Sequence, residues 1–554
     1  MAASRRLLAI ADDLSGAAEV AAALHSRTTR SRVLLIGRPG AVNGGVSDEV
    51  NGAGTTGAVN GGMARALRPR HPGEATVLDL DSRYRPATEA AEAVREALRL
   101  SSPDENAPDA LDTLVLKKID SLLRGNVAAE IAALAEGGAG MVLAPALPIA
   151  GRVVRSGVVH LGGVALHESD AWRAETLPPP ASVAHALGGL PTALVPLTTV
   201  RASRRTLLTA LRTAAAAGRV AICDAETDAD LDAVVEAALA EGPRMRLVGS
   251  GGLALALGRH LRTTLNAIGA GAAPAATGKR GAPAADAAPA APPAEMAVGA
   301  ARAAASPASA GRPVLVVVGT AEPAAAEQVR RLVEDGAVHH QLPLAGLLSG
   351  GSPVRLPPLT APVTVVSLGA PSRAPDPAPP HGAMATDTAP LPSPRPAPET
   401  VTPAAAPGPA PKPAPSPAPR PAPDTPPTPA SPSVDTADRT GPDRPDAETG
   451  KQPGAVSGRR MVLGLARVIG DAVAAHHDAV DLVLTGGETA RRVLDALAVA
   501  ELDPVGQVHH GAVHLSTPDG RSVVTRPGSF GDPDSLRQIV QALRPHSTER
   551  KVTP

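Results

Sequence analysis

The sequence predicts an α/β protein in which two mostly parallel-sheet α/β domains face a central cleft. Two observations lead to this class. Short runs of Val, Leu, Ile and Ala alternate with helical patterns, and the alternation occurs in two blocks separated by low-complexity chain. Apolar strands that alternate with helices form parallel sheets covered on both faces. Because the chain has only one Phe, one Tyr and one Trp, aliphatic side chains must form the core.

The first block begins at about residue 4, and we assign it to an N-terminal domain, residues 1–266. In residues 153–166 short apolar runs alternate with glycines, which indicates a short antiparallel segment within the otherwise parallel block. Helices are expected at residues 89–100 and 204–218. Strands are expected at residues 7–11, 33–37, 76–80, 113–117, 141–146, 220–225 and 246–250.

The second block has the same alternation, and we assign it to a C-terminal domain, residues 312–546. Its strands are expected at residues 313–319, 363–369 and 482–487. Its helices are expected at residues 324–336, 459–475 and 488–497. A second α/β domain is therefore expected, with its own sheet.

Two segments of low complexity interrupt these domains. Residues 371–456 hold 27 of the chain's 60 prolines, and proline removes backbone donors and favours an extended chain. We expect a disordered insert there, and we expect deletion of residues 375–452 to leave activity largely intact. Residues 267–311 are rich in Ala, Pro and Gly, which is typical of an interdomain linker.

Charge and composition exclude several classes of partner. Lys plus Arg total 53 and Asp plus Glu total 54, so there is no electrostatic reason to expect nucleic acid or an anionic membrane surface. No apolar stretch approaches the roughly 20 residues that cross a bilayer. Cys223 is the only cysteine, which fits a reducing compartment, and we expect a cytoplasmic protein. The oligomeric state is not fixed, and a homo-oligomer stays open.

The strongest local signal is KKIDSLLRGN, residues 117–126, which follows an expected strand and precedes a helix. Its density of fixed cations suits an anionic ligand, either a carboxylate or a phosphate. Asp120 could act as a general base toward a substrate hydroxyl. A charged surface loop with an Asn-capped helix is the plainer interpretation, and Ile119 and Leu122 partly support it. The residue types favour the functional interpretation.

Other polar residues follow neighbouring strands of the first block. Asp12 and Asp13 come directly after the first strand, where a ligand or a helix cap is equally expected. Arg83 and Arg152 follow two further strands and are expected at the same edge of the sheet, although Arg83 taken alone fits a solvated arginine better than a ligand contact. The histidines have no metal-ligand spacing, so no protein metal ligand is assigned.

Three glycine turns in the second block indicate a nucleotide site. They lie in VVVGTAE (316–322), LTGGETA (484–490) and TRPGSFGD (525–532). Glycine lets the backbone approach a phosphate, and the amides at a helix start can bind it. No GxxxxGK[ST] motif is present and no GxGxxG follows the first strand, which argues against a P-loop enzyme and a standard NAD dehydrogenase.

The ordered set of motifs resembles the four-carbon acid sugar kinase family. The motifs are ADDLSGAAE, DSR, KKIDSLLRGN, APALPIAGR, GSGGLA, GTAE, TGGETA and RPGSFG, and they cover most of both blocks. The resemblance implies a kinase that uses ATP and Mg²⁺ to phosphorylate a hydroxyl of threonate, erythronate or 3-oxo-tetronate. It also implies an N-terminal domain that holds the sugar acid and a C-terminal domain that holds ATP.

Matching motifs carry the family's site residues onto this chain. The expected catalytic residues are Asp13, Asp120, Lys117 and Arg124, with Asp13 or Asp120 as the base. The expected substrate-binding residues are Asp12, Arg83, Ser121, Asn126 and Arg152. The expected nucleotide-binding residues are Thr320, Gly486, Gly487, Glu488, Thr489, Gly528 and Gly531. One departure affects substrate choice, since Leu122 stands where the family pattern has a threonine.

Two alternative functions stay open. The first is a catalytically degenerate protein that binds a sugar acid without phosphorylating it, for which Leu122 and the long inserts leave room. The second is an NAD-dependent oxidoreductase with an atypical dinucleotide site, although the missing GxGxxG turn counts against it. Assays of ADP release on a panel of four-carbon acids would separate these alternatives from a kinase.

Overall fold

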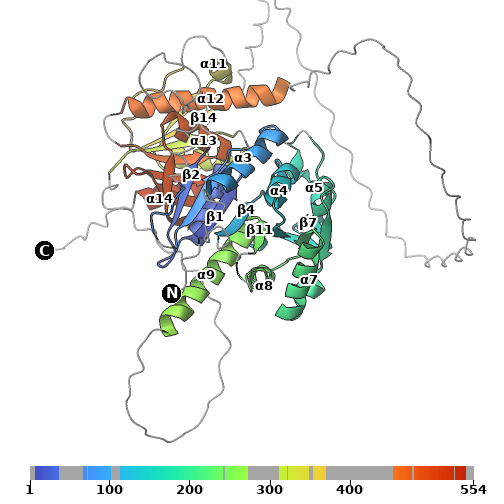
Figure 1. The fold of residues 1–554 in the computed structure, drawn as a ribbon. Helices are drawn as coiled ribbons and strands as arrows, with labels where there is room; N and C mark the ends of the chain where they lie inside the picture. The colour runs from blue at the N-terminus through green and yellow to red at the C-terminus, as the bar shows by residue number, and fades with distance from the viewer. Residues whose placement is uncertain are drawn as a thin grey trace, which may run out of the picture. The chain divides into compact units, whose positions relative to one another are not determined.

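The structure is a computed structural model, and it describes most of the two predicted blocks (Figure 1). The described residues are 6–36, 67–71, 73–101, 113–173, 175, 177–240, 242, 244–271, 311–320, 322–348, 354–369, 453–476, 479–528 and 531–544. The chain divides into two compact units, residues 1–372 with 452–554 and residues 373–451. All described residues belong to the first unit, so the expected disorder of the insert lies outside the described residues, as does most of the expected linker.

One sheet extends through both predicted blocks. Among the described residues, 15 strands pair in the order β13-β14-β12-β15-β18-β17-β16-β2-β3-β1-β4-β11-β5-β10-β9. The α/β class with mostly parallel strands is confirmed. The sheets of the two lobes are continuous because β16 (Glu501–His509) pairs antiparallel with β2 (Ser31–Leu35). This pairing gives hydrogen-bond partners to backbone N–H and C=O groups that would be unpaired if β16 and β2 were edge strands of separate sheets.

The N-terminal lobe contains a parallel run of eight strands in the described part of the chain. Besides β2, these are β1 (Arg6–Ala11), β3 (Ala75–Asp79), β4 (Thr113–Lys118), β5 (Gly140–Ala144), β9 (Thr192–Val195), β10 (Val220–Cys223) and β11 (Met245–Gly249). A separate antiparallel sheet confirms the antiparallel segment expected at residues 153–166. It consists of β6 (Arg152–Arg155), β7 (Val158–Leu161) and β8 (Val164–Ala165).

Helices cover both faces of this run. The connection from β1 crosses β3 to reach β2, and the connection from β3 crosses β1 to reach β4. Because such crossovers are right-handed, connections in opposite directions place their helices on opposite faces. The helices are α1 (Leu14–Leu24), α3 (Ala87–Ser101), α4 (Val127–Ala135), α5 (Val183–Ala186), α6 (Leu197–Val200), α7 (Arg204–Ala216), α8 (Asp228–Ala238) and α9 (Gly251–Gly271). The described residues also form the 3₁₀ turns η2 (Pro148–Ala150), η3 (Leu166–Glu168) and η4 (Asp170–Trp172). Helix α9 continues five residues into the expected linker, because its helical pattern does not end at residue 266.

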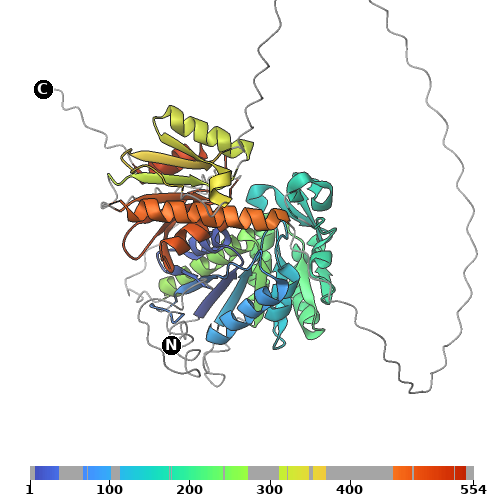
Figure 2. The same cartoon turned by 90° about the horizontal axis from the view of Figure 1, so that it is seen from above.

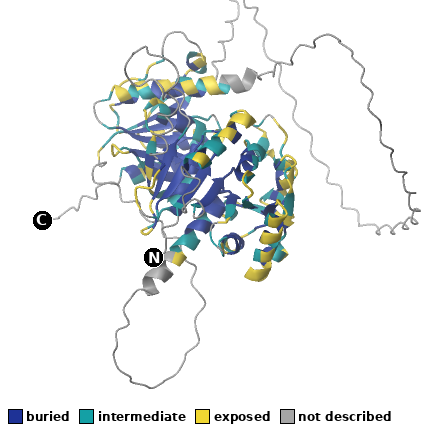
Figure 3. Ribbon diagram, viewed as in Figure 1, coloured by how far each residue is buried: buried dark blue, intermediate teal, exposed yellow. Residues whose placement is uncertain are grey.

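Small residues let α1 pack closely in the core. Five of its eight buried residues are Ala or Gly, and it packs against α9. A Cβ built on Gly258 of α9 would lie 2.1 Å from the carbonyl oxygen of Ala23, so glycine is required at this crossing. Figure 3 shows the sheet as the most deeply buried layer of the described chain. Close packing fixes where the first residues of α1 lie.

The C-terminal lobe has a mixed sheet. Its parallel strands are β12 (Val314–Val318), β13 (Val338–Leu342), β14 (Val363–Leu368), β15 (Asp481–Thr485) and β18 (Ser522–Arg526). The strand β17 (Ala512–Ser516) pairs antiparallel with both β16 and β18. The helices are α10 (Pro323–Glu334), α11 (Leu344–Leu348), α12 (Pro453–Ala474), α13 (Gly487–Ala496) and α14 (Ser535–Leu543). Figures 1 and 2 show α12 as a long helix, which packs on α11 and α13.

Candidate functional site

A cleft with a volume of about 820 Å³ lies between the two lobes. The carboxyl ends of β1 and β4 meet the starts of α10 and α13 there, as expected for ligand sites of open α/β sheets. Most of the predicted site residues line this cleft. They are Asp12, Asp13, Arg83, Asp120, Ser121, Arg124, Arg152, Gly486, Gly487, Glu488, Thr489 and Gly528.

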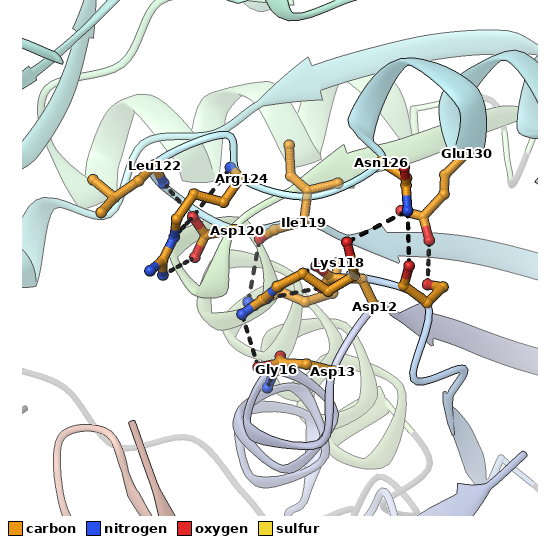
Figure 4. A network of polar contacts seen from close by, with 12 residues as sticks. Asp12, Asp13, Gly16, Lys118, Ile119, Asp120, Leu122, Arg124, Asn126 and Glu130 are labelled. Atoms are coloured by element: carbon orange, nitrogen blue, oxygen red, sulfur yellow. Dashed lines mark hydrogen bonds and ion pairs between the residues drawn. The ribbon is translucent and has the colours of Figure 1, made fainter. Parts of the chain in front are cut away.

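Asp12 and Asp13 share one arginine. The Arg83 guanidinium donates from Nε to Oδ2 of Asp12 at 2.7 Å and from Nη1 to Oδ2 of Asp13 at 2.9 Å. Asp13 also caps α1, since its Oδ1 accepts from the backbone N–H of Gly16 at 2.8 Å. The two interpretations of this aspartate pair are therefore compatible: Asp13 caps a helix and also lies at the cleft (Figure 4).

The two carboxylates differ in acidity. Burial opposes ionisation of Asp12, but Arg83 and two nearby lysines lower its pKa below the ordinary value. Burial raises the pKa of Asp13, and the negative charge of Asp12 adds to this effect although Arg83 opposes it. Asp13 is thus the carboxylate of the pair that accepts a proton more readily.

The predicted loop 117–126 wraps around an internal ion pair. Arg124 donates from Nε and Nη2 to the two oxygens of Asp120, at 2.7 and 2.8 Å. Burial opposes ionisation of Asp120, but the hydrogen bonds and charge of Arg124 hold its pKa well below the usual range. Gly125 has φ of +87°, and a Cβ there would lie 3.1 Å from the Cγ of Arg83. Glycine therefore lets the loop approach Arg83 closely.

The structure corrects the placement of Lys117. Side chains alternate along a strand, so Lys117 and Lys118 at the end of β4 point to opposite faces of the sheet. Lys117 is fully buried, and its Nζ lies 3.0 Å from Glu130 of α4, outside the cleft lining. Lys118 lines the cleft, with its Nζ 3.4 Å from Glu19 of α1. The lysine at the cleft is therefore Lys118.

Asn126, Thr320 and Gly531 also lie outside the cleft lining. Asn126 Nδ2 donates to the carbonyl oxygens of Ser82 at 2.8 Å and Arg85 at 2.9 Å, so it holds the segment that carries Arg83. It occupies the N-cap position of α4 without a side-chain cap hydrogen bond. Thr320 Oγ1 instead accepts from the backbone N–H of Glu322 at 3.2 Å.

The glycine turns lie where phosphate groups could approach the backbone. Gly486 has φ of +89°, and α13 begins at the next residue with Glu488 and Thr489 in its first turn. A Cβ built on Gly528 would lie 3.6 Å from Thr320, so two of the predicted turns are neighbours. A Cβ built on Gly319 would lie 2.1 Å from Thr489 Oγ1. Glycine backbone without side chains, together with the free N–H groups of a helix N-terminus, is suited to binding a polyphosphate.

The described part of the chain has no group of three or more His, Cys, Asp or Glu side chains that could hold a metal ion alone. This is compatible with Mg²⁺, which is usually held by one or two carboxylates, several waters and substrate phosphates. Asp13 and Glu488 are carboxylates at the cleft beside the glycine turn. The residues present therefore fit a metal that arrives with a nucleotide.

Several cleft residues were not among the sequence predictions. They are Glu19, Asp81, Tyr84, Lys118, Arg173, Glu322, Arg459, Arg492 and His510. Because Lys117 and Lys118 are adjacent in a strand, the sequence indicated that they would face opposite sides of the sheet. It did not indicate which of the two would face the cleft. Asp81 belongs to the same DSR segment as Arg83, which was a usable signal. Arg492 lies inside a helix and carries no motif that marks it.

The fold and the cleft define a two-lobed α/β protein with a candidate ligand site between the lobes. Residues 7–257 match the family model "Sugar-binding N-terminal domain", and residues 432–536 match "Nucleotide-binding C-terminal domain". The chain belongs to the four-carbon acid sugar kinase family. No helix in the described residues combines the length and apolar character that a membrane span requires.

Curated relatives are D-threonate kinases. The chain is 36% identical to the Cupriavidus necator enzyme over 253 residues, which is 45% of this chain and 53% of that protein. It is 30% identical to the Salmonella typhimurium enzyme over 258 residues, 46% of this chain and 53% of that protein. The Bordetella bronchiseptica enzyme is 34% identical over 233 residues, 39% of this chain and 54% of that protein. The chain thus spans about half the length of the curated relatives that it matches.

Solved structures support the fold. A protein from Salmonella typhimurium LT2 superposes with a TM-score of 0.57 at 16% identity, over 96% of this chain and 98% of that one. A Haemophilus influenzae protein superposes with a TM-score of 0.50 at 16% identity, over 96% of this chain and 99% of that one. At this identity the likeness concerns the fold alone.

Proposed function

We propose that this protein is an ATP-dependent kinase that phosphorylates a hydroxyl of a four-carbon sugar acid such as threonate, erythronate or 3-oxo-tetronate. One observation carries the proposal: the first residue of α13 lies directly against Asp13. A Cβ built on Gly487 would lie 2.5 Å from Oδ2 of Asp13 and 3.0 Å from Oγ of Ser15. A phosphate bound at this helix start would therefore lie beside a carboxylate that can accept the proton of a substrate hydroxyl.

The ion pairs at the cleft point to Arg152 as the group that binds the carboxylate of the acid. The other cations of this lobe at the cleft are already paired with carboxylates, because Arg83 contacts Asp12 and Asp13, Arg124 contacts Asp120 and Lys118 contacts Glu19.

Arg152 instead donates to the hydroxyl of Ser121, and in the described residues it forms no ion pair with a carboxylate. Arg152 is partly buried, and burial lowers its pKa although Asp120 and Glu19 oppose the shift. An anionic ligand would supply a direct counter-charge. Arg152 and Ser121 therefore form the proposed site for the carboxylate of the substrate.

Asp13 is the proposed general base. It is partly buried with a raised pKa, and a carboxylate has about four acceptor positions, so its contacts with Arg83 and Gly16 leave room for a substrate hydroxyl. Asp120 is less suited, since Arg124 occupies both of its oxygens and keeps its pKa low. Its proposed role is to fix Arg124 and the loop around Ser121.

The nucleotide would bind with its phosphates on the Gly486–Gly487 turn and beside Gly528, with Glu488 and Thr489 in the first turn of α13. Mg²⁺, held by those phosphates and by Asp13 or Glu488, would neutralise the charge of the transferring group. The surrounding residues orient the hydroxyl, and the two lobes limit the access of water. The proposed division assigns sugar-acid binding to residues 1–266 and nucleotide binding to residues 312–546. A cytoplasmic location and a homo-oligomer stay predictions.

The test is an assay of ADP release with ATP and Mg²⁺ on D-threonate, L-threonate and D-erythronate. Threitol and erythritol, which lack the carboxylate, are the matched controls. We expect turnover on at least one acid, and at least 100-fold lower kcat/KM on the neutral tetritols, a difference of about 3 kcal/mol for a buried charge pair. Binding of an acid without turnover would instead support the degenerate binding protein. Reduction of NAD by any of these acids would support the oxidoreductase.

A further inference from the structure

Two consecutive arginines of α13 hold the chain segment that follows β3 in the other lobe. Arg491 donates from Nη1 to Oδ2 of Asp79 at 2.8 Å, and Arg492 donates from Nη2 to Oδ2 of Asp81 at 2.7 Å. These residues lie more than 400 positions apart in the sequence. Asp495 accepts from both arginines, at 3.0 and 3.3 Å, and so orients both guanidinium groups. The start of the C-terminal lobe's helix is thereby fixed to the N-terminal lobe.

The segment that they hold is the one that positions Asp12 and Asp13. Asp81 has a positive φ of 50°, an uncommon conformation for a residue other than glycine. Directly after it, the backbone N–H groups of Ser82 and Arg83 donate to the carbonyl oxygen of Asp12 at 3.0 and 3.2 Å. The side chain of Arg83 then binds both carboxylates. A movement of Asp81 would therefore be transmitted to Asp13 through Arg83.

These ion pairs are not the only contacts between the lobes in the described residues. The lobes are also joined by the pairing of β16 with β2, and Glu501 of β16 lies 2.5 Å from Arg70 and 3.8 Å from Arg32. Arg492 and Asp81 are mostly buried at the cleft, with side-chain exposures of 6% and 13%. Their ion pair thus directly connects the start of α13 to the segment beside Asp13, within an interface that has other contacts.

We propose that Arg492 and Asp81 are positioning residues that couple nucleotide binding at the start of α13 to binding of the sugar acid beside Asp13. This inference rests on the proposed function, since it needs a nucleotide and an acid in the two lobes. A nucleotide that orders the first turn of α13 fixes Arg492, which fixes Asp81 and, through Arg83, the two carboxylates. By linkage, the acid must then tighten binding of the nucleotide by the same factor.

The experiment measures the Kd of D-threonate with and without saturating ADP and Mg²⁺. Trp172 is the chain's only tryptophan, and its Nε1 donates to the carbonyl oxygen of Leu122 at the cleft, so its fluorescence reports binding. In the unaltered protein we expect ADP to tighten D-threonate binding by about 5- to 150-fold. In Arg492→Gln we expect this factor to fall to within about twofold of unity, while the Kd of each ligand alone changes by less than about threefold.

Asp81→Asn should lose the same coupling, because asparagine tolerates the positive φ but loses the charge. Arg492→Gln added to Asp81→Asn should have little further effect, and Arg492→Lys should retain part of the coupling. Arg70→Gln is the matched control, since it removes an ion pair between the lobes away from the cleft lining and should leave the coupling unchanged.

Unchanged coupling in Arg492→Gln would overturn the inference, as would independent binding of the two ligands to the unaltered protein. A matching loss of affinity for ADP alone would also overturn it, because Arg492 would then be a direct ligand of the nucleotide. If the unaltered protein binds neither ADP nor any acid of the panel, the proposed function fails and this inference fails with it. Binding of both ligands without coupling leaves the proposed function intact.

Discussion

At the scale of single residues, the two aspartates proposed as bases differ in what surrounds them. Asp13 is a partly buried carboxylate with a raised pKa beside the α13 turn, whereas Asp120 is held in an ion pair by Arg124. We expect Asp13→Asn to lower kcat by roughly 10²- to 10⁴-fold, the usual contribution of a positioned general base. The measurement is steady-state ADP release on the best acid of the panel, with Tm as a check on folding.

Asp120→Asn is the comparison for that prediction. Removing this carboxylate frees Arg124 and loosens the loop around Ser121, so we expect mainly a higher KM for the acid and a smaller change in kcat than in Asp13→Asn. Near-normal turnover in Asp13→Asn, together with a large loss of kcat in Asp120→Asn, would reverse the assignment.

Asp79 gives a prediction for stability against pH. Burial raises its pKa to about 6, although Arg491 opposes the shift. For a carboxylate with a raised folded-state pKa, the contribution to stability is present below the unfolded value near 4 and is lost as pH rises through about 6. Between pH 5 and pH 7 the free energy of unfolding should therefore fall by roughly 1 kcal/mol from this group.

Urea unfolding of the unaltered protein and of Asp79→Asn at pH 5 and pH 7 checks this prediction. The variant loses the titrating group, so its free energy of unfolding should fall less over this interval. The absolute stability of the variant is not the criterion, because Arg491 also loses a partner. Equal pH dependence in the two proteins would show that Asp79 is ionised throughout.

At the scale of elements, the start of α13 gives a steric prediction. Gly487→Ala places a methyl group where Oδ2 of Asp13 and Oγ of Ser15 already lie. The carboxylate must shift, so we expect kcat to fall at least about tenfold, since misplacement of reacting groups by about 1 Å can cost 10²-fold. Alanine is a better helix former than glycine, so Tm should fall less than the steric conflict alone suggests. A variant with full turnover would contradict the proposed position of Asp13 in the reaction.

Elements with strong apolar periodicity could be predicted from the sequence, and elements without it could not. β1, β4 and β12 are buried apolar runs, and each lies within two residues of its expected range. The strand β13 has the polar sequence VHHQL at the edge of the sheet, where burial imposes no apolar pattern. The strand β16 contains Pro504 and Gly506 and has register irregularities, so no regular alternation marked it.

The site was partly predictable for the same reason. Parallel strands bring their carboxyl ends to one edge, which placed Asp13, Asp120 and Arg152 together at the cleft. Strand alternation separates Lys117 from Lys118, but the sequence does not say which face carries the ligand. The contact between Arg492 and Asp81 depends on how the two lobes meet, and no local pattern encodes a pairing over such a sequence separation.

At the scale of the whole molecule, the position of the proline-rich segment determines what can be removed. β14 ends at Leu368 and α12 begins at Pro453, and both elements belong to the same compact unit. The strand β14 pairs with β12 and β13, and described residues of α12, among them Arg459 and Met461, line the cleft. The boundary for a deletion therefore lies before residue 453, because α12 itself must be kept.

Replacing residues 375–452 with a flexible linker of about 12 Gly and Ser residues should leave kcat within about threefold of the unaltered protein. The 15 strands of the described residues form one sheet from the chain on either side of this segment. Loop-closure entropy varies only with the logarithm of loop length, so the shorter connection should stabilise the fold by roughly 1 kcal/mol and not strain it. The measurements are ADP release and Tm. A folded variant without turnover would show that the segment takes part in catalysis, and an unfolded variant would show that the lobes need it.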